Sequence, residues 1–90
     1  MTFFEQIIWD LDDDPGGNVQ HIARHHITPE EVEEVLVDPR STTTISKSSG
    51  EQITFGYTGA GRYLAVAWQM ISDAPLIARP ITAFDPNQDE

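Results

Sequence analysis

The stretch NVQHIARHHITPEEVEEVL, residues 18–36, decides the fold, because it carries two helix start signals and all three histidines of the chain. Asn18 follows the helix-breaking run DPGG at 14–17, and its side-chain oxygen is suited to cap the first turn of a helix. We therefore predict a short first helix that begins at Asn18 and ends near His26.

The second helix has the stronger start signal. Thr28 is suited to be its N-cap and Pro29 its first residue, while Glu31 at the third helical position completes a capping box. Its apolar stripe consists of Val32, Val35 and Leu36, at the spacing of a helix that lies on a core. The proline after Asp38 ends this helix.

The rest of the chain alternates between polar and apolar residues with the period of β-strands. The predicted strands are 4–11 before the helices and 41–46, 52–58, 62–70 and 76–84 after them. Trp9 is expected to face the core. Segment 62–70 is the most apolar and is expected at the centre of the sheet, whereas 41–46 is expected at an edge. Pro80 removes a backbone donor and predicts either a sheet edge or a bulge.

Short turns between the last strands predict antiparallel pairing. The expected fold is α+β: one strand, two helices and then a three- to four-stranded antiparallel sheet that the helices cover on one face. Residues 1–90 are expected to form one domain, with a frayed polar tail at 85–90.

Composition narrows the classes of partner. The chain has 15 acidic and 5 basic residues, a formal charge of -10, and no cysteine. This charge disfavours generic nucleic-acid binding, because phosphates must be met by lysine or arginine. It suits a basic partner, or it serves only to keep the protein soluble. Neither a signal peptide nor an apolar span is evident, so we expect a cytoplasmic protein without membrane contact.

The acidic and histidine residues raise two metal hypotheses. The run DLDDDPG at 10–16 is similar to a calcium loop, but proline stands where the sharp turn needs glycine, and His21 stands where the loop needs glutamate. His21 and His25 lie four residues apart on one helical face and are weak candidates to share a metal, with Asp12 or Asp14 as a third ligand. The alternative is that the histidines are solvated and favour the helix dipole, and we expect no cofactor.

Five aromatic residues lie on the predicted strands at regular spacing: Phe55, Tyr57, Tyr63, Trp68 and Phe84. We expect them to pack in the core. Stacking of nucleic-acid bases on an exposed sheet is the alternative use of such residues.

Several segments together resemble the BrnT-type toxin family, which opens with WD and continues with a basic residue, histidine, glycine and a second helix that begins with acidic residues. The similar segments here are Trp9-Asp10, RHHIT at 24–28 and EEV at 30–32. The segments EQITFG at 51–56, GRYL at 61–64 and PITAF at 80–84 are similar to the third, fourth and fifth strand segments of that family. The resemblance covers nearly the whole chain.

This resemblance implies a RelE-like ribonuclease fold, metal-independent cleavage of RNA and inhibition by an antitoxin partner, often in higher oligomers. In such enzymes a base or orienting group draws the 2′-hydroxyl proton, and cations stabilise the charge of the phosphorane. Carried over by position, the catalytic candidates are Arg24, His25 and Arg62. Arg79 joins them if its strand face points toward the open side of the helices.

The chain departs from the family pattern at several positions. His26 replaces the glycine of the family, Gln52 and Phe84 stand where the family has arginine, and a lysine of the family's first helix has no counterpart. We therefore expect a divergent, acidic BrnT-like member whose catalytic residues have eroded. It would act mainly through contacts with an antitoxin-like partner that bears a basic segment, and a homo-oligomer is also open. An active ribonuclease that binds RNA and a histidine-based metal-binding domain are the two alternatives.

Overall fold

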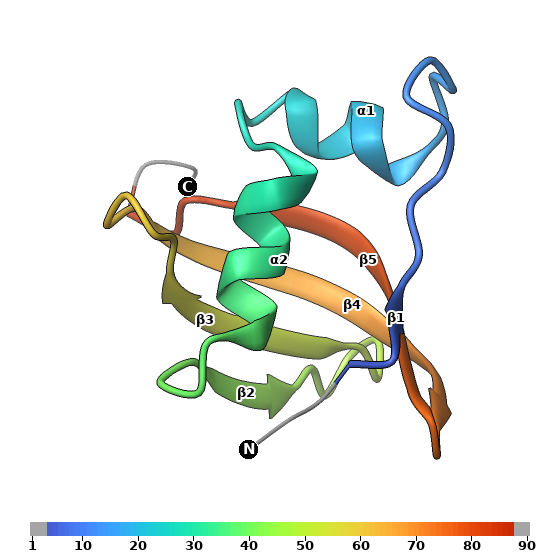
Figure 1. The fold of residues 1–90 in the computed structure, drawn as a ribbon, viewed down its shortest axis with the longest axis vertical. Coiled ribbons are helices and arrows are strands. Elements are labelled where there is room, and N and C mark those ends of the chain that lie inside the picture. Colours follow the sequence, from blue (N-terminus) through green and yellow to red (C-terminus); the bar gives the residue numbers. More distant parts are fainter. Residues whose placement is uncertain (1–3, 88–90) are drawn as a thin grey trace.

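The computed structural model describes residues 4–87, which fold into an α+β domain (Figure 1). The elements in chain order are β1 (Gln6–Ile7), α1 (Asn18–Ala23), α2 (Pro29–Val37), β2 (Thr42–Ile45), β3 (Gln52–Tyr57), β4 (Tyr63–Asp73) and β5 (Leu76–Phe84). The predicted order of strand, two helices and four strands is therefore confirmed.

The five strands form one sheet in the order β1-β5-β4-β3-β2. Strands β2 to β5 pair antiparallel with their neighbours, as the short turns predicted, and β4 lies at the centre. The expectation of a purely antiparallel sheet is wrong, because β1 pairs parallel with β5. Parallel neighbours need a long crossover, and here both helices and three strands of the chain lie between them.

The first strand is also much shorter than the predicted 4–11. Only Gln6 and Ile7 pair with β5, and Leu11, at the end of the predicted strand, is 75% exposed. Trp9 packs against the core as expected, although it lies beyond the end of the strand.

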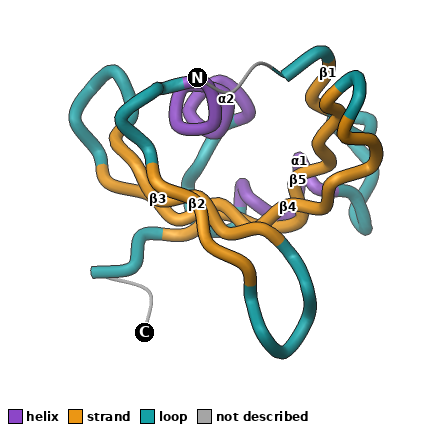
Figure 2. The backbone as a smooth tube through the Cα atoms, turned by 90° about the horizontal axis from the view of Figure 1, so that it is seen from below, coloured by secondary structure: helices purple, strands orange, loops and turns teal. Residues whose placement is uncertain are grey.

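The core lies between the helices and one face of the sheet. Helix α2 crosses β3 and β4, whereas α1 contacts β5 (Figures 1 and 2). The buried cluster joins Ile22 of α1 and Val32 and Val35 of α2 to Leu64 and Val66 of β4. Both helices thus cover the same face, as predicted.

The prediction that the strand aromatics pack in the core holds for Trp68 but is wrong for Phe55, Tyr57 and Tyr63. Gly56 faces α2, since a Cβ built there would lie 3.4 Å from Cγ1 of Val35. Its neighbours in β3 therefore point to the opposite face of the sheet, because side chains alternate along a strand. On that face the Phe55 and Tyr63 rings stack at 6.4 Å, and Tyr57 is 56% exposed.

Phe84 belongs to the same face as these rings. Ala65 pairs with both Phe55 of β3 and Phe84 of β5, so their side chains lie on one side of the sheet. Phe84 is only partly buried there, which makes its predicted place in the core wrong as well.

The two helices begin differently. Thr28 caps α2 as predicted: its side chain accepts from the backbone N–H of Glu31, whose carboxylate in turn accepts from the backbone N–H of Thr28. The predicted cap at Asn18 is wrong. Gly17 occupies the N-cap of α1 without a side-chain hydrogen bond, and Asn18 is the first helical residue, with a buried side chain.

Helix α1 ends at Ala23 instead of near His26, and a Schellman-type turn follows it. The backbone N–H of Ile27 donates to the carbonyl of Ile22 at 3.2 Å, and that of His26 donates to the carbonyl of Ala23 at 3.0 Å. His26 takes the left-handed conformation of this motif, with φ 61.

Two sequence expectations concern the last strand. Pro80 lies at a bulge, because the register with β4 shifts between the pairs Ala67–Thr82 and Trp68–Pro80; its strand is not an edge. The expectation of a frayed tail at 85–90 is wrong at Asp85, which is buried and accepts from the backbone N–H of Asn87 at 2.8 Å. Residues 88–90 lie outside the described part of the chain.

Candidate functional site

The candidate catalytic residues come from two parts of the fold. Arg24 and His25 lie in the turn after α1, and Arg62 lies at the start of β4. The η1 nitrogen of Arg62 donates to the backbone carbonyl of His26 at 2.8 Å, and its η2 nitrogen donates to that of His25 at 3.3 Å. The structure therefore brings Arg62 to the backbone of His25.

A carboxylate completes the surroundings of Arg62. Oε2 of Glu31 lies 3.7 Å from the η1 nitrogen of Arg62, and both side chains are partly exposed. The guanidinium thus connects the carbonyls of the turn after α1 to the first turn of α2. This is a structural role, and it uses two of the five N–H donors that could otherwise bind a phosphate.

The loop before β4 holds Arg62 in place. The backbone N–H of Arg62 donates to the Thr58 hydroxyl at 3.1 Å, and the backbone N–H of Thr58 donates to the carbonyl of Arg62 at 2.8 Å. The loop is tied to α2 through Gly59, whose N–H donates to Glu34 Oε1 at 3.0 Å.

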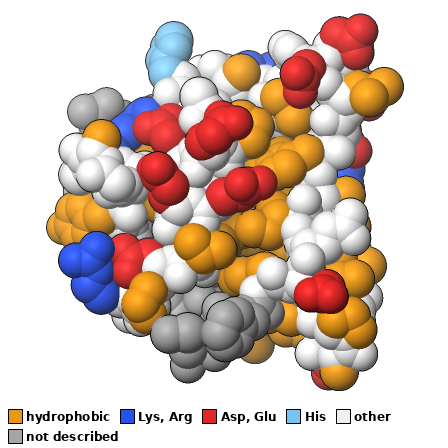
Figure 3. All heavy atoms as spheres, viewed as in Figure 1, with side chains coloured by type: hydrophobic (Ala, Val, Ile, Leu, Met, Phe, Trp, Pro, Cys, Tyr) orange, Lys and Arg blue, Asp and Glu red, His pale blue; other side chains and the backbone are white. Residues whose placement is uncertain are grey.

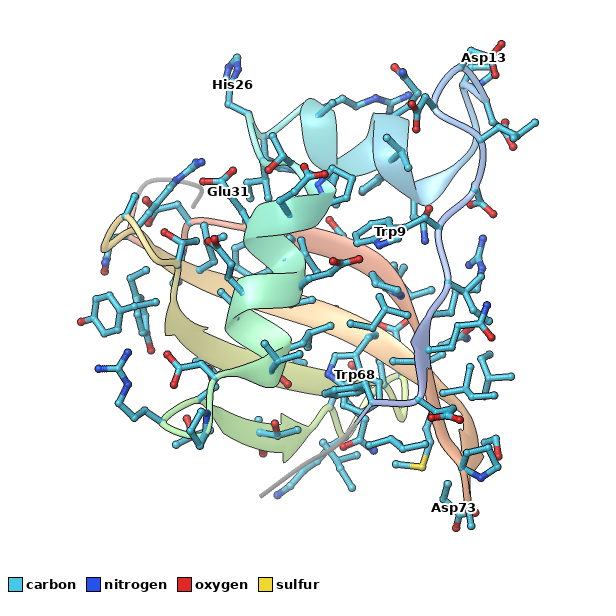
Figure 4. All side chains as sticks on the ribbon, in the orientation of Figure 1. Trp9, Asp13, His26, Glu31, Trp68 and Asp73 are labelled. Carbon is cyan, nitrogen blue, oxygen red and sulfur yellow. The ribbon has the colours of Figure 1, made fainter. Side chains whose placement is uncertain are left out.

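The other candidates lie further out. Arg24 is exposed and His25 is partly buried. The rings of His21 and His25 lie 6.3 Å apart, so the two imidazoles neighbour each other as their spacing predicted. His26 points away from the domain at its surface (Figure 4).

Within residues 4–87, no group of three histidine, aspartate or glutamate side chains is placed to hold a metal ion. His21 and His25 therefore have no third ligand in this part of the chain. Two carboxylates of the calcium-like run have other contacts. Asp14 accepts from the backbone N–H of Gly16 at 3.0 Å, and Asp10 accepts from the backbone N–H of Asn18 at 2.9 Å.

Arg79 does not join the candidate site. Its η2 nitrogen lies 2.8 Å from Asp10 Oδ2, in an ion pair between β5 and the segment after β1. The same Asp10 is linked to Asn18, whose side-chain amide donates to the carbonyls of Ile8 at 3.0 Å and Pro80 at 2.9 Å. Sequence reasoning missed this partly buried cluster, because its hydrogen-bonded residues are separated by up to 69 positions.

Acidic side chains gather over α2, where they form a red patch in the space-filling view (Figure 3). We call these residues, Glu30, Glu31, Glu33 and Glu34, the acidic face of α2. Glu33 also accepts from the indole N–H of Trp9 at 2.8 Å. The face thus combines negative charge with contacts to the neighbouring segments.

A hollow of about 470 Å³ opens between the end of α2 and the β4–β5 hairpin. Its apolar lining includes Leu36, Val37 and Trp68, and its carboxylates are Asp38 and Asp73. Asp38 is paired with Arg40 at 3.0 Å. The hollow offers apolar contact but no cluster of acid–base groups among the residues that line it.

Comparisons with protein-family models, with curated proteins and with solved structures find no match to this chain. No helix within residues 4–87 is long and apolar enough to cross a membrane.

Proposed function

We propose that this chain is a divergent BrnT-like domain of RelE-like fold whose catalytic residues have eroded, and that it acts mainly through protein contacts in a toxin–antitoxin-like setting in the cytoplasm. The proposal rests on the contacts of the Arg62 side chain. Its guanidinium is bonded to the carbonyls of His25 and His26 and lies beside Glu31. A group so engaged is poorly placed to stabilise a phosphorane.

The other arginines support the same conclusion. Arg40 lies beside Asp38 and Arg79 beside Asp10, so these guanidinium groups are also neutralised by carboxylates. Arg24 is exposed. Ribonucleases that work without a metal need cations to bind RNA and to offset charge, and an overall charge of -10 opposes both.

The backbone at His26 favours the BrnT-like assignment. This is the position where the family has glycine, and here φ is 61, a conformation that glycine adopts without strain. A left-handed turn at this point is compatible with the glycine of the family pattern, and histidine adopts this conformation only at a cost.

The proposed partner is an antitoxin-like protein with a basic segment that binds the acidic face of α2. Four glutamates lie within two turns of this helix, and Glu30 and Glu34 are exposed. Complementary charge of this kind raises the rate of association and selects the partner.

An active ribonuclease is the second candidate, favoured by the proximity of His25 and Arg62, which lie 37 residues apart in the chain. A metal-binding domain is the third, and it rests on the neighbouring rings of His21 and His25.

RNA cleavage by the purified protein separates the proposed function from that of an active ribonuclease. The assay compares wild type with His25→Ala, Arg62→Ala and Arg62→Lys at low salt with a chelator, and Arg24→Ala serves as a further variant at the exposed position. We expect wild type to cleave no faster than the variants. Cleavage that disappears in both His25→Ala and Arg62→Ala would establish a metal-independent ribonuclease and refute the proposal.

A further inference from the structure

We propose that β2 pairs with β2 of a second copy of this chain, so that two sheets join edge to edge in a two-fold symmetric dimer. This inference goes beyond the proposed function and does not depend on it. It rests on the backbone, the exposure and the charge of one edge of the sheet.

Strand β2 is an open edge. It is the last strand of the sheet on its side, and all four of its residues are exposed. An edge strand presents unpaired backbone N–H and C=O groups that can pair with another chain. Proteins usually protect such edges with charged residues, prolines, bulges or very short strands.

Three of those protections, namely charge, proline and a bulge, are missing from the four residues of β2. The segment STTTIS at 41–46 contains neither a charged residue nor a proline, and its register with β3 runs without a shift. The opposite edge of the sheet is different. There β1 has only two residues and follows Glu5, so it offers little to pair with.

Charge favours a second copy at this edge over a basic partner. Within 38–52, Arg40 and Lys47 balance Asp38 and Glu51, so this segment is neutral and the formal charge of -10 lies entirely in the rest of the chain. Two copies therefore approach with little charge repulsion through β2. A basic partner gains nothing from a neutral edge and is drawn to the acidic face of α2 instead.

The geometry of the pairing also suits identical chains. A strand that pairs antiparallel with its own copy forms an isologous interface, in which each group meets its counterpart across a two-fold axis. The threonines of β2 then form cross-strand pairs, a combination that stabilises antiparallel sheets. The axis runs perpendicular to the sheet, so the helices of both copies lie on the same side.

Exposed apolar side chains at this edge are covered in such a dimer. Ile45, at the end of β2, is 60% exposed, and Val37, at the end of α2, is 54% exposed. Val37 lines the same hollow as Thr43, so the end of α2 lies over the strand that pairs. Burial of these side chains adds hydrophobic stabilisation to the backbone hydrogen bonds.

Sedimentation equilibrium of the full chain tests the proposal, from about 1 µM to about 1 mM protein. We expect a reversible monomer–dimer equilibrium that salt strengthens, because salt screens the repulsion between two acidic copies. Thr44→Glu and Thr44→Lys each place like charges near the two-fold axis, and we expect each to raise the dimer Kd by about tenfold or more. A mixture of the two variants should dimerise again, because the charges are then opposite.

Leu11→Glu and Leu11→Lys are the matched controls, since they change the net charge equally at an exposed residue of the 10–16 loop. Circular dichroism checks that every variant is folded. Hydrogen exchange of wild type is the second measurement, and the amides of 42–45 should exchange more slowly as concentration rises. A monomer at all concentrations refutes the proposal, as does a dimer that both Thr44 variants retain or that the mixture does not restore.

Discussion

Asp10 and Asn18 exchange a reciprocal pair of hydrogen bonds between backbone and side chain. The N–H of Asp10 donates to Asn18 Oδ1, and the N–H of Asn18 donates to Asp10 Oδ2, both at 2.9 Å. Asp10 also accepts from Arg79, and Asn18 also donates to the carbonyls of Ile8 and Pro80. One partly buried cluster therefore joins the segment after β1, the start of α1 and the bulge of β5.

Replacing Asn18 with alanine should lower the free energy of unfolding by about 2–4 kcal/mol, because the N–H of Asp10 and the buried carbonyl of Pro80 lose their partner. Urea denaturation measures the change. Gln20→Ala, at an exposed residue of the same helix, is the control and should stay within about 0.5 kcal/mol of wild type. A loss at Asn18 no larger than at Gln20 would show that the cluster contributes little.

Thr28→Ala should destabilise the domain by about 1 kcal/mol, since it removes the acceptor of the Glu31 N–H. Thr28→Ser keeps a hydroxyl at the N-cap and should restore most of that stability. Thermal unfolding of the three proteins measures the difference. Equal stability of the alanine and serine variants would contradict the role of the capping box.

His26→Gly should stabilise the domain by about 0.5–1 kcal/mol, because glycine relieves the left-handed backbone strain at φ 61 and this gain exceeds the added entropy of the unfolded chain. His25→Gly is the matched control, and it should destabilise, since His25 does not have a positive φ. Urea denaturation measures both variants. If His26→Gly is as destabilising as His25→Gly, the strain at His26 is not significant.

Gly56→Ala should destabilise the domain by about 1–3 kcal/mol, because the added methyl group overlaps the Ser41 hydroxyl and lies 3.0 Å from Ser41 Cβ. The hydroxyl cannot move freely, since it donates to the carbonyl of Val35 at 2.6 Å. Gly16→Ala, where the nearest atom is 3.7 Å away, is the control for thermal unfolding. A Gly56→Ala variant as stable as the Gly16→Ala variant would mean that α2 does not pack as closely on β3 as described.

The Asp38–Arg40 pair has a predictable pH dependence. The hydrogen bonds from the Arg40 side chain and backbone lower the pKa of Asp38 below its ordinary value. A carboxyl group whose pKa is lowered by folding contributes stability above its unfolded pKa, and this contribution is lost as the pH falls through the folded pKa. We therefore expect the pair to weaken only in acid.

An NMR titration of the Asp38 carboxyl carbon measures this pKa directly. Arg40→Ala should move the titration to higher pH, since it removes the side-chain hydrogen bond that is the largest cause of the shift. Arg24→Ala, at a distant exposed arginine, should leave it unchanged. An identical titration of Asp38 in wild type and Arg40→Ala would exclude the guanidinium as the cause.

Local sequence patterns predicted much of the backbone. The capping box at Thr28, the stop after Val37 and the strand Leu76–Phe84 all follow from residues within a few positions of each other, so they were predictable. The central place of β4 followed from its long apolar run. These features depend on hydrogen bonds between nearby residues and on the hydrophobicity of one segment, and both can be read from a short stretch of sequence.

The candidate site was less predictable. The structure places Arg62 beside the backbone carbonyl of His25, and the sequence pattern did not show that this carbonyl and Glu31 would contact the guanidinium. Likewise, asparagine is a common N-cap residue, but the buried side chain of Asn18 instead donates to the carbonyl of Pro80. Side-chain partners of this kind depend on segments that are distant in the chain.

The sequence by itself determined the α+β class, the order of the elements and the acidity of the chain. Only the tertiary structure decided which face of the sheet α2 covers, and therefore that Gly56 lies inside while Phe55 and Tyr57 lie outside. Alternation along a strand defines two faces but does not say which one is buried. That choice is made by long-range packing, which also placed β1 beside β5 and left β2 at the open edge.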